Sequence, residues 1–160
     1  MRHYFLDTSS LAKLFVVEPG TTRMRSIIRA AEAGSASVKV SVCDLAHAEA
    51  VAALRQIVER GEGGRRGISK ASLRQALPVL ASVVSERSAF GVVRASDVIP
   101  EAAQIAARRQ VKGADAVHLA AAQRVRRRLN EGEEFWFVSA DVRQAAAARD
   151  EGMPVLDPTL

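Results

Sequence analysis

The residues of this chain that could do chemistry are four carboxylates, far apart in the sequence: Asp7, Glu49, Asp115 and Asp141. Several carboxylates around one point repel one another, and they need protons or a cation to offset that repulsion. Oxygen ligands without neighbouring His and Cys clusters suit Mg²⁺ or Mn²⁺ rather than zinc. Such an ion lowers the pKa of bound water and stabilises charge on a phosphodiester under attack. The four acids therefore predict metal-dependent phosphodiester chemistry, provided that the fold brings them together.

Short apolar runs alternate along the chain with longer segments of helical periodicity. The predicted strands cover residues 3–7, 37–42, 90–95 and 135–140, with a short fifth at 154–157. The predicted helices cover residues 9–17, 22–34, 43–60, 69–86, 97 or 100 to about 113, 115–129 and 141–152, and a glycine-rich loop covers 61–67. Strands separated by helices form a parallel sheet with helices on both faces. The pattern predicts one domain over 1–160, an α/β three-layer α/β/α sandwich around a mainly parallel sheet of four to five strands.

The predicted topology places all four acids near one edge of the sheet, where ligand sites of parallel sheets form. Asp7 ends the first strand, and Asp141 follows the fourth. Asp115 begins a helix, and crossover helices run antiparallel to the strands, so this helix start faces the same edge. Glu49 lies about one turn into the helix after the second strand. We therefore expect the four carboxylates to converge.

Each aspartate taken singly has a simpler explanation. An aspartate at a helix start accepts a backbone N–H and stabilises the helix by about 0.5–2 kcal/mol. Glu49 does not fit this explanation, because its helical neighbours include the small or apolar residues Leu45, Ala46 and Ala53. An unpaired carboxylate buried there would need a cation, a proton or a metal.

Composition is typical of a soluble globular domain, and the charge favours a polyanionic partner such as nucleic acid, although many basic proteins bind none. The formal net charge is +5 and the pI is about 10.1, which favours a polyanionic partner. Aromatic residues make up only 4% of the chain, so stacking of bases on aromatic platforms is not expected. The single cysteine, Cys43, suits a reducing cytosol, and no signal peptide or membrane span is expected.

Several other polar residues have simpler interpretations than a role in chemistry. His118 lies one helical turn from Asp115, but a packed histidine suffices there, and His47 lies on another helix face from Glu49. Two more acids are interpreted structurally: Asp97 as a helix cap and Asp157 as a turn residue. The basic run at 124–128 begins near a helix C-terminus, and Arg127 lies about 18 Å along the helix from Asp115. Lys13, Arg65 and Arg66 are therefore the alternative candidates for binding the phosphate of the substrate.

The segments FLDTSSLAKLF, AHAEAVAALR, KGADAVHLAAA and FVSADVRQAAAARDEGMPVLDP resemble, in order and spacing, those of a PIN domain. More narrowly, they resemble the VapC-type ribonuclease toxins of toxin–antitoxin pairs. The resemblance covers nearly the whole chain and implies a PIN-like fold. Asp7 and Asp115 match the central magnesium ligands of the family, and Glu49 and Asp141 complete its acidic pocket, partly through water.

The resemblance also implies supporting residues, a reaction and partners. Ser139 matches a position where the family often has threonine, and Thr8 and Ser9 could touch metal-bound water, with helix capping as their simpler role. The implied reaction is Mg²⁺- or Mn²⁺-dependent hydrolysis of single-stranded RNA by a metal-activated water. The implied partners are a small, DNA-binding antitoxin and a second copy of the chain, in the cytoplasm.

Two other functions remain open from the residues. One is a phosphoryl-transfer domain, since a phosphatase or receiver also carries an aspartate after its first strand. Here Asp7 is followed by Thr8 and Ser9 rather than by the second acid that such a phosphatase needs, and a receiver's adjacent acids are missing. The other is a non-catalytic module that binds RNA or protein, against which the four intact acids count.

Overall fold

The computed structural model describes residues 1–34, 36–61, 67–85 and 89–160. Residues 62–66 of the predicted glycine-rich loop lie outside the described residues, and so do the two candidate phosphate contacts in it, Arg65 and Arg66. None of the described helices is long and apolar enough to cross a bilayer.

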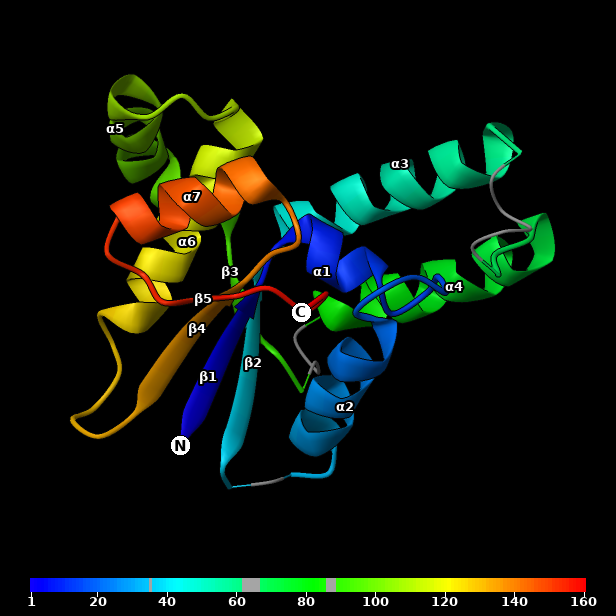
Figure 1. Ribbon diagram of the computed structural model, residues 1–160, viewed down its shortest axis with the longest axis horizontal. Helices are drawn as coiled ribbons and strands as arrows, with labels where there is room; N and C mark the ends of the chain where they lie inside the picture. The colour runs from blue at the N-terminus through cyan, green and yellow to red at the C-terminus, as the bar shows by residue number, and fades with distance from the viewer. Residues whose placement is uncertain (35, 62–66, 86–88) are drawn as a thin grey trace.

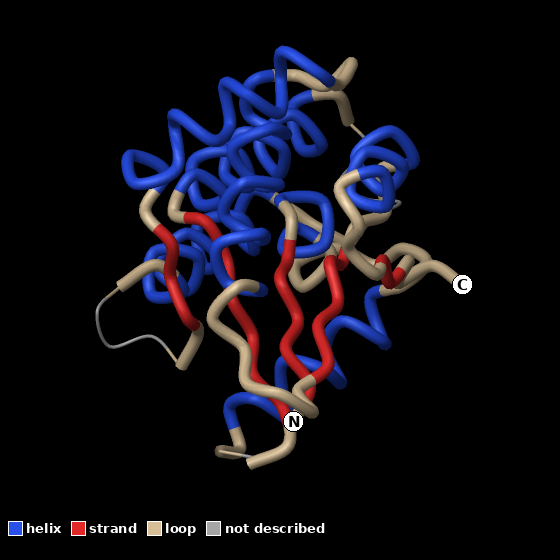
Figure 2. The backbone as a smooth tube through the Cα atoms, turned by 90° about the vertical axis from the view of Figure 1, so that its left-hand side faces the viewer, coloured by secondary structure: helices blue, strands red, loops and turns tan. Residues whose placement is uncertain are grey.

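Five strands form one sheet, in which every neighbouring pair is parallel. Their spatial order is β3 (Gly91–Val93), β2 (Val38–Cys43), β1 (Arg2–Leu6), β4 (Glu134–Val138) and β5 (Val155–Leu156). Figure 2 shows the strands side by side, with β1 inside the sheet. At its carboxyl end, Leu6 lies opposite Val42 of β2 and Val138 of β4. The predicted parallel sheet is confirmed, with five strands.

Helices cover both faces of the sheet (Figure 1). One face carries α1 (Thr8–Ala12), α2 (Thr21–Glu32), α3 (Leu45–Glu59) and α4 (Lys70–Val83). The other carries the 3₁₀ turn η1 (Ala95–Val98), α5 (Ile99–Arg108), α6 (Gly113–Arg126) and α7 (Val142–Asp150). The predicted three layers are therefore present.

Alternation of side chains along the strands builds a separate hydrophobic core on each face. Phe5 stacks on Phe137 with ring centroids 6.0 Å apart, in the core beneath α5, α6 and α7. Their strand neighbours Leu6 and Val138 point to the other face and pack with the helices from α1 to α4. Seven consecutive residues of α6, 116–122, are buried, and five of them are alanine or valine, so this helix packs closely against its surroundings.

The first helix is shorter than predicted. The periodic pattern predicts a helix over 9–17, but α1 ends at Ala12 and the chain turns before α2. The Nζ of Lys13 lies 2.7 Å from Glu18 Oε1 and 3.1 Å from the carbonyl oxygen of Pro19, which fixes this turn. Position 20 requires a glycine, because its φ is +92° and a Cβ there would lie 2.8 Å from the carbonyl oxygen of Pro158.

Two other predictions about helix starts have different outcomes. Ser69, where the predicted helix 69–86 begins, caps α4, with a capping box in which Ser69 and Ser72 each bond the other's backbone N–H. The prediction that Asp97 caps a helix is wrong. Asp97 lies within η1, and α5 begins at Ile99 without a side-chain cap, so the other predicted start, at Pro100, agrees with the structure to within one residue.

Candidate active site

All four predicted acids line one cleft at the carboxyl-terminal edge of the sheet. The cleft has a volume of about 510 Å³ and also exposes Thr8, Lys112 and His118. The acids come from four separate places: the end of β1, the second turn of α3, the first turn of α6, and the residue just before α7, namely Asp7, Glu49, Asp115 and Asp141. The four acids thus line the same cleft, because parallel strands share one carboxyl edge.

Asp7 lies at the floor of the cleft and is almost fully buried, with 1% of its surface exposed. Its Oδ1 accepts the backbone N–H of Ser10 at 2.7 Å and so caps α1. The hydroxyls of Ser139 and Ser9 donate to Oδ2 at 2.6 and 2.8 Å. Burial raises the pKa of Asp7, and its hydrogen bonds only partly oppose that rise. Asp7 is therefore a helix cap and a cleft residue at once.

Ser139 links Asp7 to the fourth acid. Its hydroxyl donates to Asp7 and accepts the backbone N–H of Asp141 at 3.0 Å. Asp141 is exposed, and its Oδ1 accepts the backbone N–H groups of Arg143 and Gln144, which caps α7. The hydroxyl at 139 thus bonds one acid directly and fixes the backbone of the other.

Glu49 is paired, which the sequence did not predict. His118 Nε2 lies 2.6 Å from Glu49 Oε2, and the Thr8 hydroxyl donates to the same oxygen at 2.5 Å. These contacts lower the pKa of Glu49, with the His118 hydrogen bond as the largest cause, and the side chain is 31% exposed. Glu49 is therefore only partly buried, and it is not unpaired as its apolar helical neighbours suggested.

The environment of His118 determines which ring nitrogen carries its proton. The side chain is buried, and Nδ1 has no hydrogen-bond partner among the described residues. A buried N–H that finds no acceptor is costly, and a proton on Nδ1 would be in that position. A proton on Nε2 can instead be donated in a hydrogen bond to the Glu49 carboxylate. We therefore assign the proton to Nε2, where it is donated to Glu49. A packed histidine was the simpler interpretation, and the structure adds this contact to it.

Asp115 lies in the first turn of α6, about half buried. Burial raises its pKa, the charge of Asp141 raises it further, and the backbone N–H of Lys112 lowers it. The influence of Asp141 shows that these two carboxylates are close enough to repel each other. The cleft thus carries two carboxylates, Asp7 and Asp115, whose negative charge is only partly offset by neighbouring hydrogen-bond donors.

The donor set of the cleft fits a hard divalent cation. It offers carboxylate and hydroxyl oxygens, and among the described residues no charged group donates a hydrogen bond to Asp7. In the described parts of the chain, however, no group of three or more His, Cys, Asp or Glu side chains is already arranged around a common point that would hold a metal. Glu49 bonds His118 and Asp141 caps its own helix, so both carboxylates already have hydrogen-bond partners within the chain.

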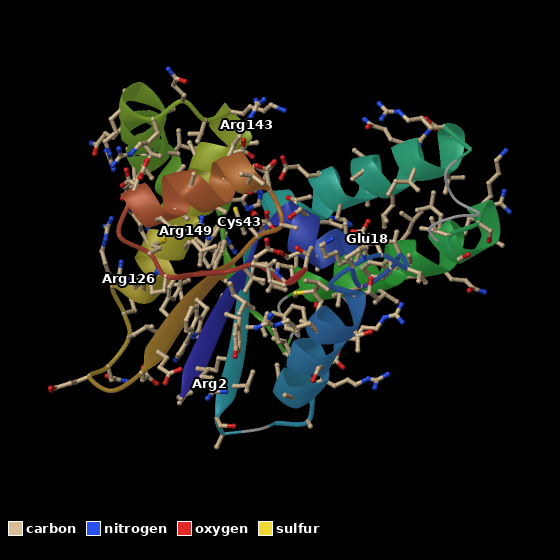
Figure 3. The ribbon with its side chains drawn as sticks, viewed as in Figure 1. Arg2, Glu18, Cys43, Arg126, Arg143 and Arg149 are labelled. Carbon is tan, nitrogen blue, oxygen red and sulfur yellow. The ribbon has the colours of Figure 1, made fainter. Side chains whose placement is uncertain are left out.

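Lys13 and the basic run at 124–128, the candidates that lie within the described residues, do not line the cleft. Lys13 is buried in its ion pair with Glu18, on the chain after α1. The basic run at 124–128 lies at the other end of α6, where Arg124 and Arg126 bond backbone carbonyl oxygens. Figure 3 labels Arg126 at this end of the helix. Lys112, which the sequence pattern did not single out, lines the cleft and lowers the pKa of Glu49 by its charge. Its position three residues before Asp115 was the available signal.

No protein-family model and no curated protein matches this chain. Among solved structures, the crystal structure of FitAcB from Neisseria gonorrhoeae contains a similar chain, with a TM-score of 0.55 and 13% sequence identity. A toxin–antitoxin complex from Klebsiella pneumoniae contains another, with a TM-score of 0.56 and 16% identity. Each match covers 97% of this chain and 97% of the other. The fold is shared. At these identities the likeness concerns the fold alone, and it agrees with the predicted three-layer α/β/α class.

Proposed function

We propose that this chain is a Mg²⁺- or Mn²⁺-dependent endoribonuclease of the PIN-domain type, acting as the VapC-type toxin of a toxin–antitoxin pair. The observation that carries the proposal is the cleft in which four acids from distant parts of the chain meet, with Asp7 buried and receiving no hydrogen bond from a charged group of the described residues. The similarity in fold to a chain of a toxin–antitoxin complex supports the biological role.

Asp7 and Asp115 would hold the ion, with Glu49 and Asp141 completing the shell, partly through water. When bound, such an ion supplies a water of lowered pKa and a positive charge for the phosphate oxygens. Ser139 and Ser9 orient the Asp7 carboxylate, since both hydroxyls already donate to it. No protein nucleophile is required, and RNA would enter as a single strand that the open cleft can admit.

Two residues of this chain keep Glu49 ready for the reaction. His118 and Thr8 both donate to its Oε2, so the carboxylate stays ionised and aimed into the cleft. An ionised carboxylate at this position can accept a proton from a cleft water. Thr8 thus supports Glu49 rather than Asp7, while Ser9 supports Asp7.

The direct test is cleavage of single-stranded RNA by the purified protein. We expect cleavage with Mg²⁺ or Mn²⁺, its loss in EDTA, and a fall of about 10²–10⁴-fold in Asp7→Asn and Asp115→Asn, as for removal of groups acting on the reacting centre. Asp150→Asn is the matched control, because Asp150 is exposed on α7 and lies outside the cleft. Undiminished cleavage by both site variants would reject the proposed site.

The toxin role and its partners need a separate test. A small, DNA-binding antitoxin, a homodimer and a cytoplasmic location all follow from the proposed family. Expression of the chain alone should arrest growth, and co-expression of a short upstream reading frame should restore it. Growth arrest by Asp7→Asn equal to that of the wild type would separate toxicity from the proposed chemistry.

The same cleavage assay separates the alternatives. A non-catalytic RNA- or protein-binding module would bind RNA without cutting it in either metal. A phosphoryl-transfer domain would be labelled at Asp7 by a phosphodonor. The burial of Asp7 and the bonds to both of its oxygens make it a poor nucleophile, which disfavours that alternative.

A further inference from the structure

A second cleft adjoins the acidic one. It has a volume of about 420 Å³, and three of its lining residues, Lys112, Asp115 and Asp141, also line the acidic cleft. The shared residues come from the starts of α6 and α7, so the two clefts meet where these helices begin. A strand of RNA lying across the acids would continue into this second space.

The remaining lining residues of the second cleft differ in chemistry from those of the first. They include the guanidinium of Arg143, the amide of Gln110 and the apolar side chain of Val142, which is 81% exposed. Figure 3 shows Arg143 at the N-terminal end of α7. A cation suits a phosphate, an amide suits the edge of a base, and an exposed apolar side chain suits the face of a base or ribose. The set matches one nucleotide.

The two cations of this cleft are available to a ligand. Both Lys112 and Arg143 are exposed, and neither side chain has an ion-pair partner within the described part of the chain. Many other basic side chains are already engaged. Those with a carboxylate, amide or carbonyl partner include Lys13, Arg108, Arg109, Arg124, Arg126 and Arg127.

We propose that the second cleft binds the nucleotide next to the cleaved bond, with Lys112 and Arg143 on its phosphate and Val142 against its base or ribose. The proposal rests on the proposed ribonuclease function. RNA is favoured over an acidic peptide because this cleft shares Lys112, Asp115 and Asp141 with the acidic cleft, so a strand bound at the acids has the second cleft beside it. Neither cation is among the phosphate-binding candidates that the sequence suggests, because only the fold brings the starts of α6 and α7 together.

The experiment compares two charge-matched double variants. Lys112→Ala/Arg143→Ala removes both cations of the second cleft, whereas Lys70→Ala/Arg74→Ala removes two cations from a separate cleft between α3 and α4. Lys112 makes no side-chain cap bond at the start of α6, so its replacement leaves the helix start intact. Binding of a fluorescent single-stranded RNA is measured by anisotropy in an Asp7→Asn background, and kcat and KM are measured in the active enzyme.

We expect the cleft variant to raise Kd and KM about 10-fold and to reduce the salt dependence of log Kd by about 0.7 for each phosphate that the variant can no longer neutralise. The loss in kcat/KM should exceed any loss in kcat, because the contact to the nucleotide is made in the bound state as well as in the reacting state. The control should stay within about twofold of the wild type in Kd. Lys112→Arg should restore most of the affinity.

Other outcomes would overturn the nucleotide site, and they distinguish its failure from a failure of the proposed ribonuclease function. Equal Kd for the cleft variant and the control would overturn it, even if the wild type cleaves RNA. Unchanged RNA affinity together with abolished antitoxin binding would assign the cleft to the protein partner, and would also overturn it. A wild type that never cleaves RNA, with binding that still depends on Lys112 and Arg143, would support the nucleotide site and reject the ribonuclease.

Discussion

Replacing the buried Asp7 with asparagine should stabilise the protein while it destroys activity. The two side chains have the same shape, and asparagine is as good a helix cap as aspartate, so the bond to the Ser10 N–H survives. The hydroxyls of Ser9 and Ser139 can rotate to accept from the new amide. The substitution removes the free-energy cost of burying an ionised carboxylate, and this cost is what raises the pKa of Asp7 in the folded state.

The sign and size follow from linkage. A carboxyl group whose pKa is higher in the folded state favours folding when it is protonated. Its contribution to stability is therefore complete at pH values below 3.8, the pKa of Asp in the unfolded chain. That contribution is lost as pH rises through the folded-state pKa. Each unit between the two values costs about 1.4 kcal/mol. After allowance for the charge-assisted hydrogen bonds that asparagine cannot make, we expect Asp7→Asn to be about 1 kcal/mol more stable at pH 8, or about 2–4 °C in Tm.

Thermal unfolding from pH 4 to pH 8 in EDTA measures this effect. The difference in Tm between Asp7→Asn and the wild type should be near zero at the acid end and should grow with pH. Asp141→Asn is the control for the cap, because Asp141 also caps a helix but is exposed, and its Tm should rise by less than that of Asp7→Asn, since it relieves only the repulsion with Asp115. A Tm for Asp7→Asn below that of the wild type, by the same amount at every pH, would refute the reasoning.

Two further predictions concern paired carboxylates. His118→Leu removes the main donor to Glu49 and should lower kcat/KM for RNA about 10-fold, whereas His118→Gln keeps a donor and should recover most of it; equal losses at equal Tm would contradict the positioning role. Glu151, whose pKa is lowered to about 2 chiefly by Arg108, contributes stability that is present above its unfolded value of 4.5 and is lost as pH falls through 2. Glu151→Gln should therefore lower Tm by about 2–4 °C at pH 7, allowing for solvent screening, with the gap closing in acid; a gap independent of pH would count against it.

The layered fold and the location of the site follow from local features of the sequence. Alternating short apolar strands and periodic helices leave a parallel sheet as the arrangement that buries both faces, and such a sheet has one carboxyl edge. Asp7 and Asp141 follow strands that end at that edge, and Asp115 begins a helix that starts there. Their convergence therefore needs no knowledge of side-chain packing.

Helix boundaries and helix starts were less predictable, because they depend on contacts made across the fold. The periodic pattern continued past Ala12, but the buried pair of Lys13 and Glu18 turns the chain there. Asp97 has a typical capping residue type, yet Pro100 sets the start of α5 instead. In both cases a tertiary contact or a backbone restriction outweighs the local preference.

The sequence by itself determined the layers, the sheet edge and the four acids at it, because strand direction and helix periodicity are local properties. Only the tertiary structure decided the partners of those acids. Glu49 meets His118 across 69 positions, and Ser139 meets Asp7 across 132. It also decided which cations are available to meet RNA, since depth of burial and side-chain direction depend on how the layers pack, and periodicity does not encode either.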